Sequence, residues 1–485
     1  MPRARANALI CVGVLFAITM VWFASLGAAP PHPARRAETT TPAGVAARLK
    51  IKHVVVIVQE NRTFDNLFGG YALAPVGGPL AYPRADSTYP PEVVAKMRPA
   101  GFDAAHTPGD ASHDAYACLN EALPSQPRFS SQRWISVSTP PAPASCPNAG
   151  SFFLYVPTSQ RAVYWEIANA YGLGDRFFAA TTSASFPPHQ FIVAGDLSIT
   201  WPQKGGRVWH ISEDPYYSCF GANSGSHTLQ VVGPNVFSIP LHIDGPEGGC
   251  YNRLTYGDRL TQANATWRHY TTALPAGGGP FPFDGFSNIA QWYEQTVNLP
   301  TAQFIGSTKI LDDAKSPLPN FVWVKPPCTK QSDHPGAGQG HHGPNWVGSV
   351  INAIGKGPNW DSTVIFVIWD DWGGFYDHVI PPVTDPTSEE LGRGVRIPFL
   401  VISPYLAHPG GVVHTPGHPG SIMRFVDDLY GLTPLTAFDR QAPDLAGWFD
   451  FTQPPRRFVP IAGAVGNGKV WDDTWCDGKV MIKVD

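Results

Sequence analysis

The chain has 485 residues, of which 43% are hydrophobic and 12% aromatic, and its formal net charge is −4. That length can bury a large core, and the aromatic content excludes an intrinsically disordered chain. Charged residues make up only 15% and no run rich in Lys and Arg occurs, which argues against a nucleic-acid-binding protein. With 48 glycines and 50 prolines, the composition is typical of a loop-rich globular enzyme.

The N-terminus has the order of a targeting segment. Arg3 and Arg5 precede an apolar stretch over residues 8–26, and small residues follow it up to Ala29. This charged, apolar, small-residue order is typical of a secretory signal. The stretch is long for a signal peptide, and Pro30 disfavours cleavage after Ala29, so an uncleaved membrane anchor is the alternative.

These features divide the chain into three parts. We predict a signal peptide or signal anchor over residues 1–29, a flexible linker rich in Pro, Ala and Thr over 30–49, and a catalytic domain over 50–485. The catalytic domain is then secreted or periplasmic, and any membrane contact is expected through the N-terminal segment.

Six of the seven cysteines lie outside the apolar N-terminal stretch. An even number in an exported chain indicates three disulfides. Proximity in the sequence favours the pairs Cys118–Cys146 and Cys219–Cys250, which leaves Cys328 with Cys476, although other pairings stay open. The absence of a Cys-x-x-Cys motif argues against structural zinc.

Strand and helix patterns alternate through the catalytic domain. Apolar runs typical of strands buried on both faces occur over Ile51–Val58, Phe321–Val324, Thr363–Trp369 and Ile397–Ile402. Helical spacing predicts helices over Trp346–Ile354 and Ser421–Tyr430, with Gly431 as a C-terminal stop. This alternation predicts an α/β fold with a mainly parallel central sheet flanked by helices. Residues 72–160 and 201–285 lack it, and we interpret them as loop-rich insertions over the active site.

Polar residues follow two of the predicted strands. Glu60 and Asn61 come after the first, and Asp370 and Asp371 after Thr363–Trp369. In open α/β sheets, ligands bind at the carboxyl ends of the strands. Adjacent buried carboxylates repel each other unless a cation compensates, and oxygen ligands suit Mg²⁺, Ca²⁺ or Mn²⁺, with Zn²⁺ as a further option. The alternative is an N-capping Asp with a solvated neighbour, but a second polar pair favours one shared divalent ion.

Ser185 is the candidate nucleophile. It precedes Pro187 and Pro188 in a segment that predicts the start of a helix. One interpretation is that Ser185 only caps this helix. The other is that its hydroxyl lies at a helix N-terminus, which attracts phosphate, and that a bound metal lowers the pKa of the hydroxyl. Ser183 is the second candidate.

Proton transfer to a leaving group is assigned to histidines in Gly- and Pro-rich loops. The candidates are His334 first, then His113 and His418, with His378 in a similar loop. A phosphoester hydrolase needs an acid for the leaving oxygen or donors for the phosphate. Loop histidines that merely lie on the surface are the alternative.

Several motifs together resemble the bacterial phosphoesterase family that contains exported phospholipases C and acid phosphatases. In chain order they are IKHVVVIVQENRTFDNLFGGY (51–71), SFPPHQFIVAG (185–195), SDHP (332–335), WDSTVIFVIWDDWGGFYDHVIPP (360–382), GRGVRIPFLVISPYLAHPGGVVH (392–414) and HPGSIMRFVDDLYGL (418–432). They span residues 51 to about 450, and the first and fourth are long and specific.

The resemblance implies an alkaline-phosphatase-like fold and a hydrolase with Ser185 as nucleophile, forming a phosphoseryl intermediate. The residues that it implies around one metal ion are Glu60, Asn61, Ser185, Asp370 and Asp371. His334 matches the histidine of the family's Asp-His-Pro motif. One departure is Pro188, which stands where family members usually have Asn.

The substrate implied is a phosphomonoester or the head-group diester of a phospholipid. A phospholipase C could hold choline in an aromatic box, although most aromatic residues are expected in the core. The C-terminal β-domains of larger phospholipases C are not found after the motifs, which favours a compact phosphatase-like member. A non-catalytic, metal-binding surface protein of the same fold is an alternative from another class. A sulfatase-like enzyme is disfavoured, because Pro188 and His189 supply no Arg after Pro187.

Overall fold

A computed structural model of the chain separates Met1–Thr39 from Thr40–Asp485, and the residues that it describes belong to the second unit. They are residues 47, 50–69, 98–99, 154–156, 158–181, 185–201, 207–213, 227–233, 236–243, 253–271, 285–297, 299–327, 331–335, 342–375, 377, 379, 381–382 and 394–464. The predicted signal segment, His113, Ser183, His378 and the six cysteines considered for disulfides lie outside this part, and their assignments stay predictions.

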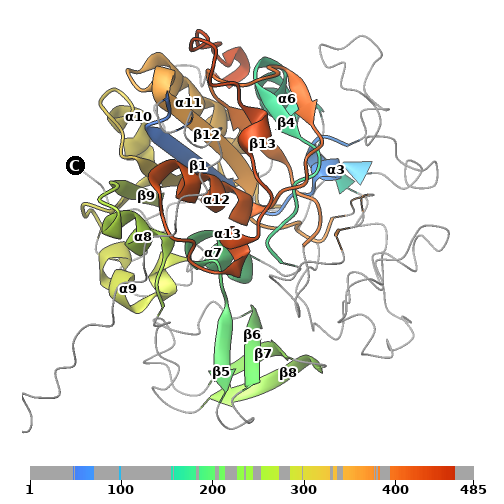
Figure 1. Cartoon of the computed structure of the whole chain (residues 1–485). Coiled ribbons are helices and arrows are strands. Elements are labelled where there is room, and N and C mark those ends of the chain that lie inside the picture. Colours follow the sequence, from blue (N-terminus) through green and yellow to red (C-terminus); the bar gives the residue numbers. More distant parts are fainter. Residues whose placement is uncertain are drawn as a thin grey trace, which may run out of the picture. The chain divides into compact units, whose positions relative to one another are not determined.

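An eight-stranded sheet forms the centre of the described part (Figure 1). Its strands, in spatial order, are β10 (Phe304–Gly306), β9 (Trp267–Thr271), β11 (Phe321–Val324), β1 (His53–Gln59), β12 (Thr363–Trp369), β13 (Phe399–Ile402), β4 (Gly172–Gly174) and β14 (Gly411–Val413). Neighbouring strands from β10 to β12 are parallel, and β4 pairs in parallel with β14. Only β13 runs antiparallel to both of its neighbours. The prediction of a mainly parallel sheet is therefore confirmed.

The central strands are hydrophobic throughout because both of their faces are covered. Every residue of β11, β12 and β13 is buried, and so are Val54–Gln59 of β1. Full burial of a Val or Ile side chain stabilises a fold by about 1.5–3 kcal/mol, so these strands account for much of the core. The unbroken run of apolar residues is also the pattern that predicts these strands from the sequence.

One part of the sequence interpretation is wrong. Residues 201–285 are not all an insertion, because β9 lies inside this range and pairs with β11 and β10 in the central sheet. Helix α8 (Tyr256–Gln262) leads into this strand, with Thr255 and Asp258 forming a capping box at its start. Farther upstream, residues 198–243 contain a separate antiparallel sheet. Its strands, in spatial order, are β5 (Ser198–Trp201), β6 (Arg207–Glu213), β7 (His227–Gly233) and β8 (Val236–Ile243).

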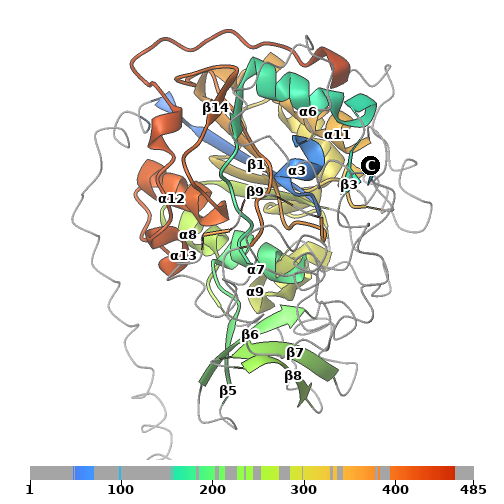
Figure 2. The ribbon, with the colours of Figure 1, turned by 90° about the vertical axis from the view of Figure 1, so that its right-hand side faces the viewer.

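Helices cover both faces of the central sheet. Figures 1 and 2 show α12 (Pro419–Tyr430) on one face, with α6 (Thr158–Ala170) and α11 (His342–Lys356) on the other. Helix α12 ends at Gly431, which adopts the left-handed conformation with φ 69°, as the sequence indicated. The remaining described helices are α3 (Phe64–Leu67), α7 (Phe186–Ala194), α9 (Ala290–Val297), α10 (Ile310–Asp313) and α13 (Ala437–Arg440).

Shorter elements complete the described part. A two-stranded sheet pairs β2 (Arg98–Pro99) with β3 (Leu154–Tyr155). The 3₁₀ helices are η6 (Phe286–Asn288), η7 (Ser307–Lys309), η9 (Trp360–Ser362), η10 (Ala446–Trp448) and η11 (Ala462–Ala464).

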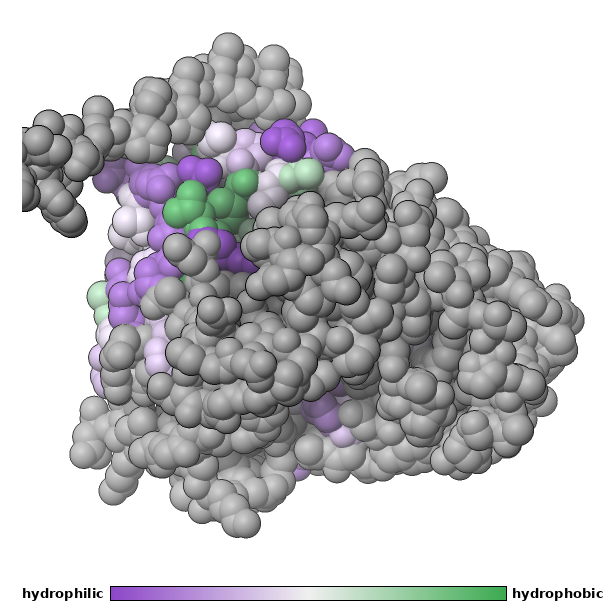
Figure 3. All heavy atoms as spheres, turned by 90° about the horizontal axis from the view of Figure 1, so that it is seen from below, coloured by the Kyte–Doolittle hydropathy of each residue, from purple (hydrophilic) through white to green (hydrophobic). Residues whose placement is uncertain are grey.

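In the view of Figure 3, most of the described residues in sight are hydrophilic, and one small hydrophobic group lies among them. The large hydrophobic side chains exposed in the described ranges are Leu254 and Val459. Among the same residues, no helix has the length and apolar character needed to cross a membrane.

Candidate active site

The site is built where β1 and β12 end side by side. Gln59 pairs with Trp369 as the last residue pair of this ladder, and the Asp370 backbone N–H donates to the Gln59 carbonyl at 3.0 Å. Glu60 and Asp370 are therefore brought together directly after the two strands. The Asn61 backbone N–H then donates to Asp370 Oδ1 at 3.0 Å, which ties the two loops to each other.

Tight turns in both loops make this approach possible. Asn61 adopts a left-handed conformation with φ 58°, and Gly373 adopts one with φ 60°. A Cβ atom on Gly373 would lie 2.5 Å from the Asn61 carbonyl oxygen, so only glycine fits here. The Gly373 N–H donates to Asp371 Oδ1 at 2.7 Å, and this bond fixes the carboxylate of Asp371.

Ser185 joins the two strand ends from a third element. It stands at the N-cap position of α7, but its side chain makes no capping hydrogen bond. Its hydroxyl oxygen instead lies 2.9 Å from Asp371 Oδ2 and 3.1 Å from Asn61 Oδ1. The interpretation of Ser185 as a mere helix cap is therefore wrong. The printed contacts bring together four residues of the predicted metal set, Asn61, Ser185, Asp370 and Asp371. The fifth, Glu60, follows the same strand as Asn61, but its carboxylate contacts Lys325.

The two adjacent carboxylates carry an electrostatic penalty. Asp370 and Asp371 are both fully buried. Burial, followed by the charges of Asp371 and Glu60, raises the pKa of Asp370 well above its ordinary value. The Asp370 Oδ2 atom is buried and accepts no hydrogen bond from the described residues. A buried carboxylate oxygen without a hydrogen-bond donor is stabilised when it binds a proton or a cation.

A buried lysine lies on the other side of Glu60. Lys325, the first residue after β11, places its Nζ atom 3.0 Å from Glu60 Oε1 and 2.6 Å from His189 Nε2. An ammonium group only donates, so His189 Nε2 must be the unprotonated ring nitrogen. Burial and the charge of Lys325 lower the pKa of His189 well below its ordinary value, so its 3.9 Å contact with Asp370 Oδ2 is not an ion pair.

The loop that carries His334 is held by its neighbour Asp333. Tyr164 and Trp369 both donate to Asp333 Oδ2, the latter at 3.2 Å. Asp333 has φ 69°, and Arg62 Nε donates to its carbonyl at 3.0 Å. Burial raises the pKa of Asp333 to about 6, against the opposing effects of Arg62 and the two donors.

The predicted catalytic histidines differ in what they contact. His334 is partly buried and its Nδ1 lies 2.8 Å from the Pro335 carbonyl, so Nδ1 carries the proton and Nε2 is the basic nitrogen of the neutral ring. His418 caps α12, since its Nδ1 accepts from the Gly420 N–H at 3.1 Å. A role of either ring in proton transfer stays a prediction.

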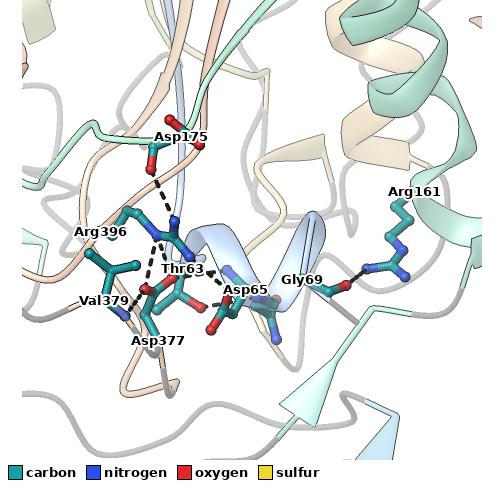
Figure 4. A network of polar contacts seen from close by, with 9 residues as sticks. Thr63, Asp65, Gly69, Arg161, Asp175, Asp377, Val379 and Arg396 are labelled. Carbon is teal, nitrogen blue, oxygen red and sulfur yellow. Dashed lines mark hydrogen bonds and ion pairs between the residues drawn. The ribbon is translucent and has the colours of Figure 1, made fainter. Parts of the chain in front are cut away.

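A buried ion-pair network supports the site from one side (Figure 4). Arg396, which is fully buried, donates to both carboxylate oxygens of Asp377 at 2.9 and 3.1 Å and to Asp65 Oδ1 at 2.9 Å. It also donates to the Asp175 carbonyl at 3.0 Å and lies over the ring of Phe64. Arg396 therefore links α3, which follows the β1 loop, with the segment after β12.

The candidate donor atoms are carboxylate, amide and hydroxyl oxygens, which is the chemistry that suits a divalent cation. The Ser185 hydroxyl lies within hydrogen-bond distance of both Asn61 Oδ1 and Asp371 Oδ2, so three oxygen atoms meet at this point. The buried Asp370 Oδ2 atom has no donor in the described part. Within that part, no group of three or more His, Cys, Asp or Glu side chains converges as a metal cluster. The candidate set instead combines carboxylates with an amide and a hydroxyl, and Glu60 is turned towards Lys325.

The comparisons with known proteins assign the family. The phosphoesterase family profile matches residues 51–433, which is more than half of the chain. The chain belongs to the phosphoesterase family. This phosphoesterase is 24% identical to a non-hemolytic phospholipase C of Pseudomonas aeruginosa over 452 residues, which cover 84% of this chain and 58% of that protein. It is also 24% identical to phospholipase C B of Mycobacterium tuberculosis (strain CDC 1551 / Oshkosh), over 84% of this chain and 80% of that one.

The predicted family is therefore confirmed. The phosphoesterase spans less than two thirds of the length of the P. aeruginosa relative. Among solved structures, it is similar to a Vibrio parahaemolyticus protein in the alkaline phosphatase superfamily, with 11% identity, a TM-score of 0.34, and coverage of 81% of this chain and 70% of that one. The description of the fold therefore rests on the strand order observed in the central sheet.

Lys325 and Tyr164 are residues of this site that the sequence patterns did not single out. The segment Phe321–Val324 was recognised as a strand, but the residue after it was not considered. The rule that ligands bind at the carboxyl ends of parallel strands points to Lys325 as directly as to Glu60 and Asp370. Tyr164 carried no such signal, because its contact with Asp333 joins residues far apart in the sequence.

Proposed function

We propose that this phosphoesterase is an exported, metal-dependent phosphoric-ester hydrolase in which Ser185 is the nucleophile. The observation that carries the proposal is the position of the Ser185 hydroxyl. It lies within hydrogen-bond distance of Asn61 and Asp371, at the meeting point of the loops after β1 and β12. A serine that only capped a helix would have no reason to face a buried carboxylate.

The residues that would hold the ion are Glu60, Asn61, Ser185, Asp370 and Asp371. A divalent ion there, Mg²⁺, Ca²⁺, Mn²⁺ or Zn²⁺, would lower the pKa of the serine hydroxyl and offset the negative charge of the phosphoryl group.

The chain's own residues then carry the reaction. The Ser185 oxygen attacks phosphorus while the ester bond to the leaving alcohol breaks, and Asp371 Oδ2 is placed to accept the hydroxyl proton. The resulting phosphoserine is hydrolysed by water, which returns the free hydroxyl. His334 is the first candidate to transfer a proton to the leaving oxygen, with His113 and His418 next. The Nδ1 proton of His334 is engaged by the Pro335 carbonyl, so the ring would act as an acid in its protonated form, giving up the proton on Nε2.

Two substrate classes remain to be separated. Similarity to phospholipases C of P. aeruginosa and M. tuberculosis favours cleavage of a phospholipid head-group diester. A phosphomonoester is the other class. The first experiment compares p-nitrophenyl phosphate with p-nitrophenylphosphocholine on purified full-length chain, with and without EDTA. We expect release of p-nitrophenol from one of them and a lower rate in EDTA.

The nucleophile is tested with Ser185→Ala, which is expected to abolish turnover. Ser316→Ala is the matched control, because Ser316 is an exposed serine outside the site. Full activity in Ser185→Ala would overturn the assignment. Failure of the wild-type chain to hydrolyse either substrate in any of the four metals would favour the non-catalytic alternative.

A further inference from the structure

The loop that carries His334 is bound along its backbone to the loop after β1. Donors from the β1 loop reach three successive carbonyl groups of the His334 loop. These hydrogen bonds run from Gln59 Nε2 to the Gln331 carbonyl at 3.0 Å, from the Glu60 N–H to the Ser332 carbonyl at 2.7 Å, and from Arg62 Nε to the Asp333 carbonyl at 3.0 Å. The β1 loop also contains Asn61, which contacts Ser185, so the backbone next to His334 is held against the loop that meets the nucleophile.

The Asp333 side chain adds a second anchor directly before His334. Asp333 has φ 69°, a left-handed conformation that is uncommon outside glycine, so contacts are needed to hold it. Its Oδ2 atom accepts from the Tyr164 hydroxyl and from the Trp369 indole N–H, the latter at 3.2 Å. Its Oδ1 atom lies against Gly343 of α11 and leaves no room for a Cβ atom there. The carboxylate is therefore enclosed on both sides.

Tyr164 connects this anchor to the ends of two central strands. Burial, followed by the charge of Asp333, raises the pKa of Tyr164 well above its ordinary value, so the hydroxyl keeps its proton and donates it to Asp333. The same hydroxyl oxygen accepts from Gln59 Nε2 at 3.1 Å, and the Tyr164 ring packs edge-on against Trp369 with centroids 5.0 Å apart. Gln59 and Trp369 end β1 and β12, the strands that lead into the site.

We propose that Tyr164 is a positioning residue for His334: its hydroxyl fixes the Asp333 carboxylate and thereby the place of the adjacent imidazole at the leaving oxygen of the ester. This inference rests on the proposed function, in which His334 transfers a proton to that oxygen. Without the hydroxyl, Asp333 loses a donor and the loop can shift. A misplacement of a catalytic group by about 1 Å can lower a rate by on the order of 100-fold.

The leaving group provides the readout. p-Nitrophenolate departs with little help from an acid, whereas an alkoxide needs a proton as the ester bond breaks. For phosphomonoesters, the substrates compared are p-nitrophenyl phosphate and β-glycerophosphate. For phosphocholine diesters, they are p-nitrophenylphosphocholine and dibutyryl phosphatidylcholine. The two esters of each class share the transferred group, and their kcat/KM values report the first step, in which the alcohol leaves and phosphoserine forms.

The full-length Tyr164→Phe variant is expected to discriminate between the two esters. We expect kcat/KM to fall by on the order of tenfold for the alkyl ester and by less than about twofold for the p-nitrophenyl ester. His334→Asn should show the same pattern with a loss on the order of 100-fold for the alkyl ester. In the double variant, Tyr164→Phe should add no further discrimination, because it acts through His334.

Tyr171→Phe is the matched control. Tyr171 is also buried, and its hydroxyl donates to the Val459 carbonyl at 2.8 Å. Its loss is expected to leave the ratio of the two kcat/KM values unchanged. Thermal melting checks that each variant folds. If Tyr164→Phe does not, Asp333→Asn replaces it, because the amide keeps the shape of the side chain but is a weaker acceptor, and the same pattern is expected.

Two results would overturn the inference while His334 keeps its assigned role. They are equal losses for both esters in a folded Tyr164→Phe, and a further loss confined to the alkyl ester when Tyr164→Phe is added to His334→Asn. Equal losses for both esters in His334→Asn itself would instead remove the proton-transfer role of His334 from the proposed function, and the inference with it.

Discussion

Arg396 offers a strong test of how the loops around the site are held. The perturbation is Arg396→Met, which keeps an extended side chain and removes the guanidinium. In the native chain this group donates to the carboxylates of Asp377 and Asp65 and to the Asp175 carbonyl. The side chains of Arg396, Asp65 and Asp377 are each at most 1% exposed. Removing one partner of a buried ion pair costs about 3–5 kcal/mol, since the remaining charge stays in a low-dielectric environment.

The expected loss is at the upper end of that range, because two carboxylates lose the same cation. Chemical denaturation followed by tryptophan fluorescence measures the free energy of unfolding. Arg396→Lys keeps the charge but cannot reach all of these partners, so we expect an intermediate loss of about 1–3 kcal/mol. Arg457→Met, which changes an exposed arginine, is the control and should stay within about 0.5 kcal/mol of the wild type. A loss below about 1 kcal/mol in Arg396→Met would refute the reasoning.

Three other substitutions test single features. Gly373→Ala should lower the free energy of unfolding by about 1–3 kcal/mol and weaken Mn²⁺ binding in calorimetry. The reason is that Gly373 has φ 60° and that the Asn61 carbonyl leaves no room for a Cβ atom. Wild-type values of both quantities would contradict this. Asp427→Asn should raise the free energy of unfolding at pH 8 but not at pH 3. Burial raises the pKa of the Asp427 carboxyl, so the contribution of this group to stability is lost as the pH rises above its ordinary pKa. Equal shifts of the denaturation curves at the two pH values would contradict this. Tyr164→Phe removes a donor to buried Asp333, and we expect a loss of about 1–3 kcal/mol by denaturation, whereas no loss would show the contact to be unimportant.

The strands that sequence reasoning found share one property, an unbroken apolar run. Thr363–Trp369 and Phe321–Val324 have the predicted bounds, since nothing but their burial on both faces determines their composition. Strand β9 was missed because its residues include Arg268, His269 and Thr271, and the last two are polar yet buried. No periodicity in the sequence distinguishes such a strand from a loop.

Strand β4 was missed for a different reason. It has three residues, and two of them are glycines. A Cβ at Gly174 would lie 2.9 Å from the ring of Phe399, and one at Gly172 would lie 3.1 Å from the ring of Trp448. These glycines admit aromatic rings that come from more than 200 residues farther along the chain. Glycine usually indicates a turn, and only the tertiary contact shows why it stands in a strand here.

The acidic part of the site followed from one rule, that ligands gather at the carboxyl ends of parallel strands. Glu60, Asn61, Asp370 and Asp371 were found in this way because they directly follow strands with clear apolar patterns. The partners that hold the loops could not be found so easily. Arg396 meets Asp65 across 331 residues, and no local pattern relates the two.

The absence of a capping hydrogen bond from Ser185 can be explained by two residues that follow it, Pro187 and Pro188. Pro187 and Pro188 were taken as a sign that a helix begins there, and it does. A serine at the N-cap accepts from the N–H group of the second or third helical residue, and in this helix both of those residues are proline. Neither has an N–H group to donate, so the hydroxyl cannot cap the helix. The sequence that starts α7 thereby leaves Ser185 available to face Asn61 and Asp371, and the competition between the capping and nucleophilic roles is removed by the two prolines.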